Sequence, residues 1–253
     1  MPGVAADPVG RHRQAGGVGG PCPVPPHQQA RGADQRAREF GFDAPTKLVR
    51  IGLLSTLPGR WVEAATRAAC AVEGERIEIV EGRMRDLTPR LERGRIDVVI
   101  GVLDESADAA DSLFSEGYAL AMAADHPLAR HAALEPEAVA GAEMIVRRNC
   151  EALAQVSRFF TRRGVRPFFA ARTADDERAV SYVKAGLGIT VMPRCFAQPG
   201  MAMPTLAGFD QRRRIGLIAD PAARKRIEHS AILQRFAETI RAMAAETLAA
   251  KPA

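Results

Sequence analysis

The run IDVVIGV at residues 96–102 constrains the fold more than any other stretch of this chain. A nearly continuous apolar run of this length is typical of a strand covered on both faces, as in a parallel sheet. Similar strands are predicted at 47–54 and 76–82, with helices between the three strands at 61–72 and 84–94. Strands that alternate with helices form parallel sheets with right-handed crossovers. We therefore expect an α/β fold from residue 47 onward.

The same alternation repeats in the second half of the chain. Strands are predicted at 116–124, 143–148, 167–173, 188–193 and 214–220, and helices at 151–164, 176–186 and 223–250. The last helix is long and amphipathic, and the arginines at 212–214 are placed just ahead of the late strand. Two such sets with a late return strand indicate a bilobal binding protein.

The first 46 residues have a different composition. They contain fifteen Gly or Pro and no Leu or Ile, so they cannot bury enough apolar surface to offset chain entropy. We predict a disordered arm at 1–46, without a helix-turn-helix. Its start lacks the apolar core of a secretory signal, and the chain has no apolar run near the roughly 18 residues of a membrane span. We expect a cytoplasmic protein.

The formal charge of +5 raises the question of nucleic-acid binding, which would need arginines gathered on one face. The arginines at 83–95 instead alternate with Asp86, Glu92 and Asp97, a pattern that predicts a solvated helix. The cysteines have no CxxC or zinc-ligand spacing. They are Cys22, Cys70, Cys150 and Cys195. Buried free thiols are the main interpretation, and a redox pair between Cys150 and Cys195 is the alternative.

A catalytic role is not expected. The chain has no HExxH, GxSxG, GxGxxG or Walker motif, and its histidines lie far apart in sequence. They are His12, His27, His126, His131 and His229. We expect no catalytic residue, no metal site and no cofactor.

Four segments together resemble the effector-binding domain of LysR-type transcriptional regulators. They are RIGLL at 50–54, LERGRIDVVIG at 91–101, EGYALAMAADHPLA at 116–129 and VKAGLGITVMP at 183–193. Their order and spacing match over residues 47 to about 248. The resemblance implies the type II periplasmic-binding-protein-like fold, with two α/β lobes joined by two crossover strands and a ligand in the cleft. The domain is then 47–253, with lobe I at 47–120 and 216–253 and lobe II at 121–215.

The resemblance also implies a function. Such a domain senses a small-molecule effector, and lobe closure controls transcription through the packing of a dimer or tetramer on a promoter. The family's winged helix-turn-helix is missing from residues 1–46, so DNA binding is expected only if a longer form supplies that module. The alternatives are a stand-alone solute-binding protein without DNA binding and a non-functional remnant of a regulator.

Ligands of α/β sheets bind beyond the carboxyl ends of the strands. In lobe I these ends predict Ser55, Thr56, Gly101 and Val102 as ligand-binding residues. Hydroxyls and free amides before the helix near Arg60 would suit a carboxylate, and plain helix capping is an equal alternative.

In lobe II the same argument predicts Arg147, Asn149, Thr173, Gly188 and Thr190. Arg147 is the candidate for a bidentate clamp on the effector, which we expect to be a carboxylate. Its neighbour Arg148 is expected to face solvent. The acids at 175–177 are expected to charge the first turn of the next helix.

The turn AGLGITVMP at 185–193 is expected to connect that helix to a buried strand. Gly186 should end the helix in a left-handed conformation, and Gly188 should let the backbone approach the cleft. A purely structural role for both glycines is the alternative.

Overall fold

The computed structural model describes residues 47–249. The arm predicted at 1–46, with Cys22, His12 and His27, lies outside the described residues. The first strands and helices follow the predicted order: β1 (Lys47–Leu54), α2 (Gly59–Cys70), β2 (Glu75–Gly82), α3 (Met84–Glu92) and β3 (Val98–Val102). β1 pairs in parallel with β2 on one side and β3 on the other. The predicted parallel β-α-β-α-β unit is confirmed.

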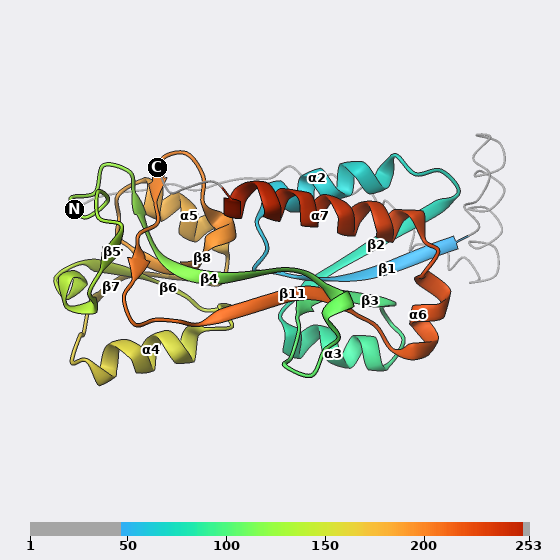
Figure 1. The fold of residues 1–253 in the computed structure, drawn as a ribbon, viewed down its shortest axis with the longest axis horizontal. Helices are drawn as coiled ribbons and strands as arrows, with labels where there is room; N and C mark the ends of the chain where they lie inside the picture. The colour runs from blue at the N-terminus through green and yellow to red at the C-terminus, as the bar shows by residue number, and fades with distance from the viewer. Residues whose placement is uncertain (1–46, 250–253) are drawn as a thin grey trace, which may run out of the picture. The chain divides into compact units, whose positions relative to one another are not determined.

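Two long strands extend this sheet. β4 (Ser112–Ala123) and β11 (Arg212–Ile218) are antiparallel to each other, and β11 lies between β3 and β4. The strand order is β2-β1-β3-β11-β4-β8 (Figure 1). β4 pairs with β11 through its first half and with β8 (Thr190–Pro193) and β9 (Met201–Ala202) through its second half. The lobe boundary expected between residues 120 and 121 falls inside β4, and the one expected between 215 and 216 falls inside β11.

The second set of elements forms around β8. Its members are β6 (Glu143–Arg147), α4 (Leu153–Arg162), β7 (Phe168–Thr173) and α5 (Asp176–Lys184). β6 pairs in parallel with β7, and a single bridge between Met144 and Ile189 joins β6 to the start of β8. The remaining short elements are β5 (Ala133–Leu134), β10 (Thr205–Leu206) and the 3₁₀ helices Ala109–Asp111, Pro136–Val139 and Arg194–Phe196.

Helices cover both faces of the first parallel strands. α2 and α7 (Ala231–Ala249) lie side by side on one face, where Trp61 and Phe236 are fully buried (Figure 1). α3 covers the opposite face through Leu87 and Leu91. Gly52 leaves room for the side chains on this face, because a Cβ there would lie 2.6 Å from the Ile96 side chain and 3.4 Å from that of Leu87 in α3.

The prediction of a single helix at 223–250 is wrong, because the chain forms two helices there, α6 (Pro221–Ile227) and then α7. Ser230 separates them. Its Oγ accepts a hydrogen bond from the Leu233 amide at 3.2 Å and donates one to Glu75 at 2.8 Å, and Glu75 also accepts the Ile232 amide at 3.0 Å. These bonds satisfy amides in the first turn of α7, so a new helix begins there.

The placement of the arginines at 212–214 ahead of the late strand is also wrong. They form the first residues of β11, whose alternation turns Arg213 inward while Arg212 is exposed.

The helix end at Gly186 agrees with the prediction. Gly186 has φ 75°, its amide bonds to the Val183 carbonyl, and the Leu187 amide bonds to the Tyr182 carbonyl. This is a Schellman cap.

Candidate functional site

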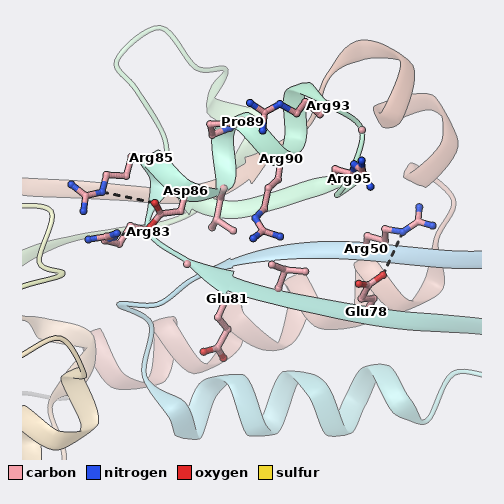
Figure 2. Close-up of a pocket in the computed structure, with 14 residues that line it drawn as sticks. Arg50, Glu78, Glu81, Arg83, Arg85, Asp86, Pro89, Arg90, Arg93 and Arg95 are labelled. Carbon is pink, nitrogen blue, oxygen red and sulfur yellow. Dashed lines mark hydrogen bonds and ion pairs between the residues drawn. The ribbon is translucent and has the colours of Figure 1, made fainter. Parts of the chain in front are cut away.

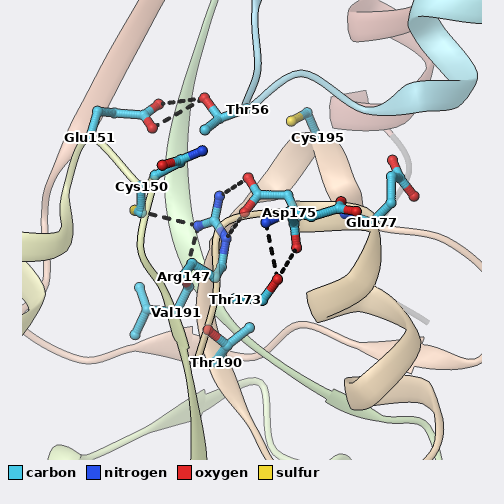
Figure 3. A network of polar contacts seen from close by, with 12 residues as sticks. Thr56, Arg147, Cys150, Glu151, Thr173, Asp175, Glu177, Thr190, Val191 and Cys195 are labelled. Atoms are coloured by element: carbon cyan, nitrogen blue, oxygen red, sulfur yellow. Dashed lines mark hydrogen bonds and ion pairs between the residues drawn. The ribbon is translucent and has the colours of Figure 1, made fainter. Parts of the chain in front are cut away.

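A buried polar network lies where the loop after β1, strands β4 and β11, and the start of α4 meet. Thr56 donates a hydrogen bond to Glu151 at 3.2 Å and accepts one from Arg213 at 2.9 Å. Arg213 also forms an ion pair with Glu151. Figure 3 shows Glu151 facing Thr56. These three residues therefore join segments that are far apart in the sequence, and we call them, with Glu116, the junction network.

Arg213 has a second acidic partner in Glu116. Its Nε and Nη2 donate to Glu116 Oε1 at 2.9 and 2.8 Å, and the Cys195 amide donates to the other carboxylate oxygen at 2.6 Å. Burial alone would lower the pKa of Arg213, but Glu116 and Glu151 raise it well above its ordinary value. The guanidinium therefore remains charged in the interior.

The charge of Arg213 also shifts the pKa of Glu151. Burial would raise the pKa of its carboxyl, but the charge of Arg213 and further hydrogen bonds hold the pKa below its ordinary value. The carboxyl is thus ionised at neutral pH. Its negative charge can therefore attract or repel a charged ligand that approaches it.

Arg147 lies in a second buried pair. It donates to Asp176 through Nε at 2.8 Å and through Nη2, and to the Val191 carbonyl at 3.2 Å (Figure 3). The Arg147 side chain is 1% exposed and that of Asp176 is 4% exposed. The sequence interpretation of Arg147 as a free clamp therefore needs correction, because Asp176 already occupies its guanidinium. Asp176 begins α5, as expected, but its carboxylate faces inward and not into solvent.

Three other predicted residues use their side chains to hold the local backbone. Asn149 donates to the Ala174 carbonyl at 2.8 Å, and Thr190 donates to the Ile145 carbonyl at 2.8 Å. Thr173 accepts the Asp175 amide at 3.0 Å. These bonds tie the ends of β6, β7 and β8 together.

Of the predicted residues without side-chain polar groups, Gly101 is buried, and Gly188 and Val102 are half-buried. Gly188 contacts β6, since a Cβ there would lie 2.5 Å from the Glu143 carbonyl oxygen. Gly101 packs against α3, where a Cβ would lie 2.3 Å from Met84 Sδ, and Val102 pairs with Ile215. Gly188 therefore lets two strands approach each other, as the structural alternative expects, and its place at a ligand cleft stays a prediction.

A cavity of about 900 Å³ lies between α4 and strands β6, β7 and β8, and we call it the α4 cavity. Two predicted residues, Arg147 and Thr190, line it. Its walls are mainly apolar, with Met144, Ile145, Val156, Phe160, Val165, Phe169 and Val191 among them. The size and the apolar lining with a few polar groups are typical of a small-molecule site.

Charged side chains line the same cavity. Arg166 and Arg172 are exposed residues, and neither forms a hydrogen bond or ion pair with any residue in 47–249. The Arg172 guanidinium lies 5.2 Å from the centroid of the Phe169 ring. Glu151 of the junction network also lines the cavity. The lining thus combines apolar surface with two guanidiniums that have no acidic partner in the described part of the chain.

A second cavity, of about 220 Å³, is lined by another predicted hydroxyl residue, Ser55. The Ser55 Oγ is buried and has no hydrogen-bond partner among the described residues. Four carboxylates line this cavity, from Glu81, Asp175, Asp176 and Glu177, and no Arg or Lys of the described residues lines it. A carboxylate ligand is therefore less well matched here than in the α4 cavity.

The described cysteines are Cys70, Cys150 and Cys195, and all three are free thiols. Cys150 and Cys195 are buried as expected, whereas Cys70 is exposed, which corrects the prediction for that residue. Burial raises the pKa of Cys150 and that of Cys195.

Over residues 47–249 no group of His, Cys, Asp or Glu has the arrangement of a metal site. None of the described helices has the length and apolar character needed to cross a bilayer.

Sequence reasoning missed Glu116, Glu151 and Arg213, which carry the junction network. A signal existed for two of them. Glu116 and Arg213 are charged residues in strands, and they lie just ahead of apolar runs at 118–124 and 215–218. Paired burial is the usual reason for a charge inside such a strand.

Comparisons with known proteins identify the family. The LysR substrate binding domain model matches residues 43–245. A mutant of OxyR from Corynebacterium glutamicum is similar in structure, with a TM-score of 0.60 at 20% identity, over 88% of this chain and 72% of that one. No curated protein gives a significant sequence match.

Two effector-binding domains are similar as well. The BenM domain with its effector benzoate has a TM-score of 0.54 at 22% identity, over 83% of this chain and 97% of that one. The QuiR domain in complex with shikimate has a TM-score of 0.54 at 17% identity, over 79% and 97%. These structures show the type II periplasmic-binding-protein-like fold that the sequence resemblance implies. The chain therefore belongs to the LysR substrate-binding-domain family.

Proposed function

We propose that this domain senses a small acid with an apolar body, which binds in the α4 cavity. The observation that carries the proposal is the lining of that cavity, where apolar walls lie beside the unpaired guanidiniums of Arg166 and Arg172. A guanidinium binds a carboxylate through two parallel hydrogen bonds. The similar BenM and QuiR domains bind benzoate and shikimate respectively, and both of these ligands are small carboxylates.

Glu151 connects the cavity to the rest of the domain. It lines the α4 cavity and also holds Thr56 and Arg213. A bound anion would repel the Glu151 carboxylate and so change the junction network. Occupancy of the cavity then alters contacts between segments that belong to the two expected lobes.

Further contacts join the same segments. Arg60 donates to the carbonyls of Cys195 and Ala197 at 2.7 and 3.0 Å, and the Gly59 amide donates to Glu177 at 2.7 Å. These bonds connect the start of α2 with the elements around β8. We propose that they open or close as the effector binds, and that this lobe movement is the signal.

The output we propose is regulatory and not catalytic. The domain would act in the cytoplasm within a dimer or tetramer, where lobe movement changes subunit packing. DNA binding would come from a helix-turn-helix in a longer form. We prefer this output to a non-functional remnant because Glu151 both lines a cavity and pairs with the buried Arg213.

Thermal unfolding with added acids tests the proposal. Benzoate and shikimate are the probes, and benzamide is the uncharged control. We expect an acid to raise the unfolding midpoint with concentration, because a ligand that binds the folded state stabilises it by mass action. The variant Arg166→Gln/Arg172→Gln should lose this shift.

Arg130→Gln/Arg178→Gln is the matched control, since both arginines are exposed and line neither cavity. Circular dichroism establishes that each variant is folded. An acid shift that survives in Arg166→Gln/Arg172→Gln would contradict the α4 cavity as the site. A shift equally large with benzamide would contradict the role of the two guanidiniums.

A further inference from the structure

A second positively charged hollow lies on the sheet face that α3 covers. This groove of about 1210 Å³ is bounded by α3, the turn after it, and strands β1 and β2 (Figure 2). Six arginines line it: Arg50, Arg83, Arg85, Arg90, Arg93 and Arg95. We call it the arginine groove. None of its lining residues belongs to the α4 cavity.

The acids of the groove leave half of these arginines without a partner. Arg50 pairs with Glu78 at 3.4 Å, and Arg83 pairs with Asp86 at 2.7 Å. Arg85 lies 3.9 Å from the same Asp86. The remaining three are Arg90, Arg93 and Arg95, and the guanidinium of none of them makes a hydrogen bond or ion pair with a residue in the described range.

The third acid of the lining does not offset this charge. Figure 2 shows Glu81 on the side of β2 away from α3, while Arg90 extends from α3 toward the strands. Strand alternation explains the difference, because Glu78 and Val80 face the groove and Glu81 follows Val80. The positive charge is therefore concentrated on the α3 side.

The end of α3 does not require these guanidiniums. Cations near a helix C-terminus often serve its free carbonyls. Here the carbonyls of Pro89, Arg90 and Leu91 accept backbone amides of residues 93, 95 and 94 at 3.3, 2.8 and 2.9 Å. The three unpaired guanidiniums thus remain available to a ligand.

We propose that the arginine groove binds a small oligophosphate, at a site separate from the effector cavity. Guanidinium groups match phosphate oxygens in geometry, and several of them in one hollow suit a ligand with several phosphate groups. A concave site fits a compact anion better than the backbone of a DNA duplex. The proposal does not depend on an acid binding in the α4 cavity.

Calorimetric titration with inorganic tripolyphosphate at low salt tests the proposal. We expect saturable binding that weakens by about tenfold or more in Arg90→Gln/Arg93→Gln/Arg95→Gln. The control variant is Arg130→Gln/Arg178→Gln/Arg241→Gln, which removes the same charge from exposed arginines elsewhere. It should bind nearly as the unaltered protein does.

Three outcomes would overturn the proposal. They are no saturable binding, equal weakening in both triple variants, and tighter groove-dependent binding of a short DNA duplex than of tripolyphosphate. The second would indicate a general charge effect, and the third would assign the groove to DNA. Circular dichroism of both variants separates a lost site from a lost fold.

Discussion

Arg213 and Glu116 lie directly opposite each other in the ladder between β11 and β4, and their charged groups meet in the interior. Both side chains are almost fully buried, at 2% and 0% exposed. Removing one partner of such a pair leaves the other charge buried without compensation. We therefore expect Arg213→Met to reduce the free energy of unfolding by about 3–5 kcal/mol, measured by urea denaturation.

The double variant Arg213→Met/Glu116→Leu is the control for this pair. It removes both charges, so it should recover part of the lost stability. Glu151 would still lose its ionic partner, which limits the recovery. If the double variant were less stable than Arg213→Met alone, the assignment of the loss to an unpaired Glu116 would be wrong.

Glu151 predicts a pH dependence of stability. Its pKa in the folded protein is lowered, so its stabilising contribution is present above the pKa of the unfolded chain. That contribution is lost as the pH falls through the lower, folded-state pKa. We expect Glu151→Gln to be less stable than the unaltered protein at neutral pH, and the difference in unfolding free energy to shrink on acidification. A difference that stays constant down to about pH 3 would contradict the pairing of Glu151 with Arg213.

Ser230 predicts a smaller and more local effect. Its hydroxyl accepts an amide of the first turn of α7 and binds Glu75, so Ser230→Ala should cost about 1 kcal/mol of unfolding free energy. Ser181→Ala is the control, since that residue is exposed within α5 and should change stability by less than about 0.5 kcal/mol. Equal losses in the two variants would show that Ser230 does not cap α7.

The two glycines of the turn at 185–193 should respond differently to alanine. Gly186→Ala forces a side chain into a left-handed conformation but meets no atom within 4 Å, so it should cost about 1 kcal/mol. Gly188→Ala would place its Cβ 2.5 Å from the Glu143 carbonyl oxygen. We expect a larger loss of unfolding free energy there. A smaller loss for Gly188→Ala than for Gly186→Ala would contradict the close contact with β6.

The order of strands and helices could be predicted from the sequence because each element has its own apolar pattern. The end of α5 at Gly186 was accessible for the same reason, since a helix cap is a local feature. The break before α7 was not accessible, because it depends on Glu75, which is 155 residues from Ser230. Apolar periodicity alone continues across that break.

The site was harder to predict than the fold for a related reason. Arg147 was expected to meet a ligand, and its actual partner Asp176 lies 29 residues away. Arg213 and Glu116 are 97 residues apart, so the local sequence around each residue does not show its partner. The neutralisation of a buried charge depends on tertiary contacts that no local pattern contains.

The position of β11 between β3 and β4 has a consequence for synthesis on the ribosome. β3 ends at Val102, but its outer partner begins only at Arg212, and β4 also pairs with that same strand. A nascent chain that ends before residue 212 therefore exposes unpaired edges on two apolar strands. Such edges pair readily with other chains. Fragments truncated before β11 should aggregate, because the sheet that the first half of the chain begins is closed only by Arg212–Ile218.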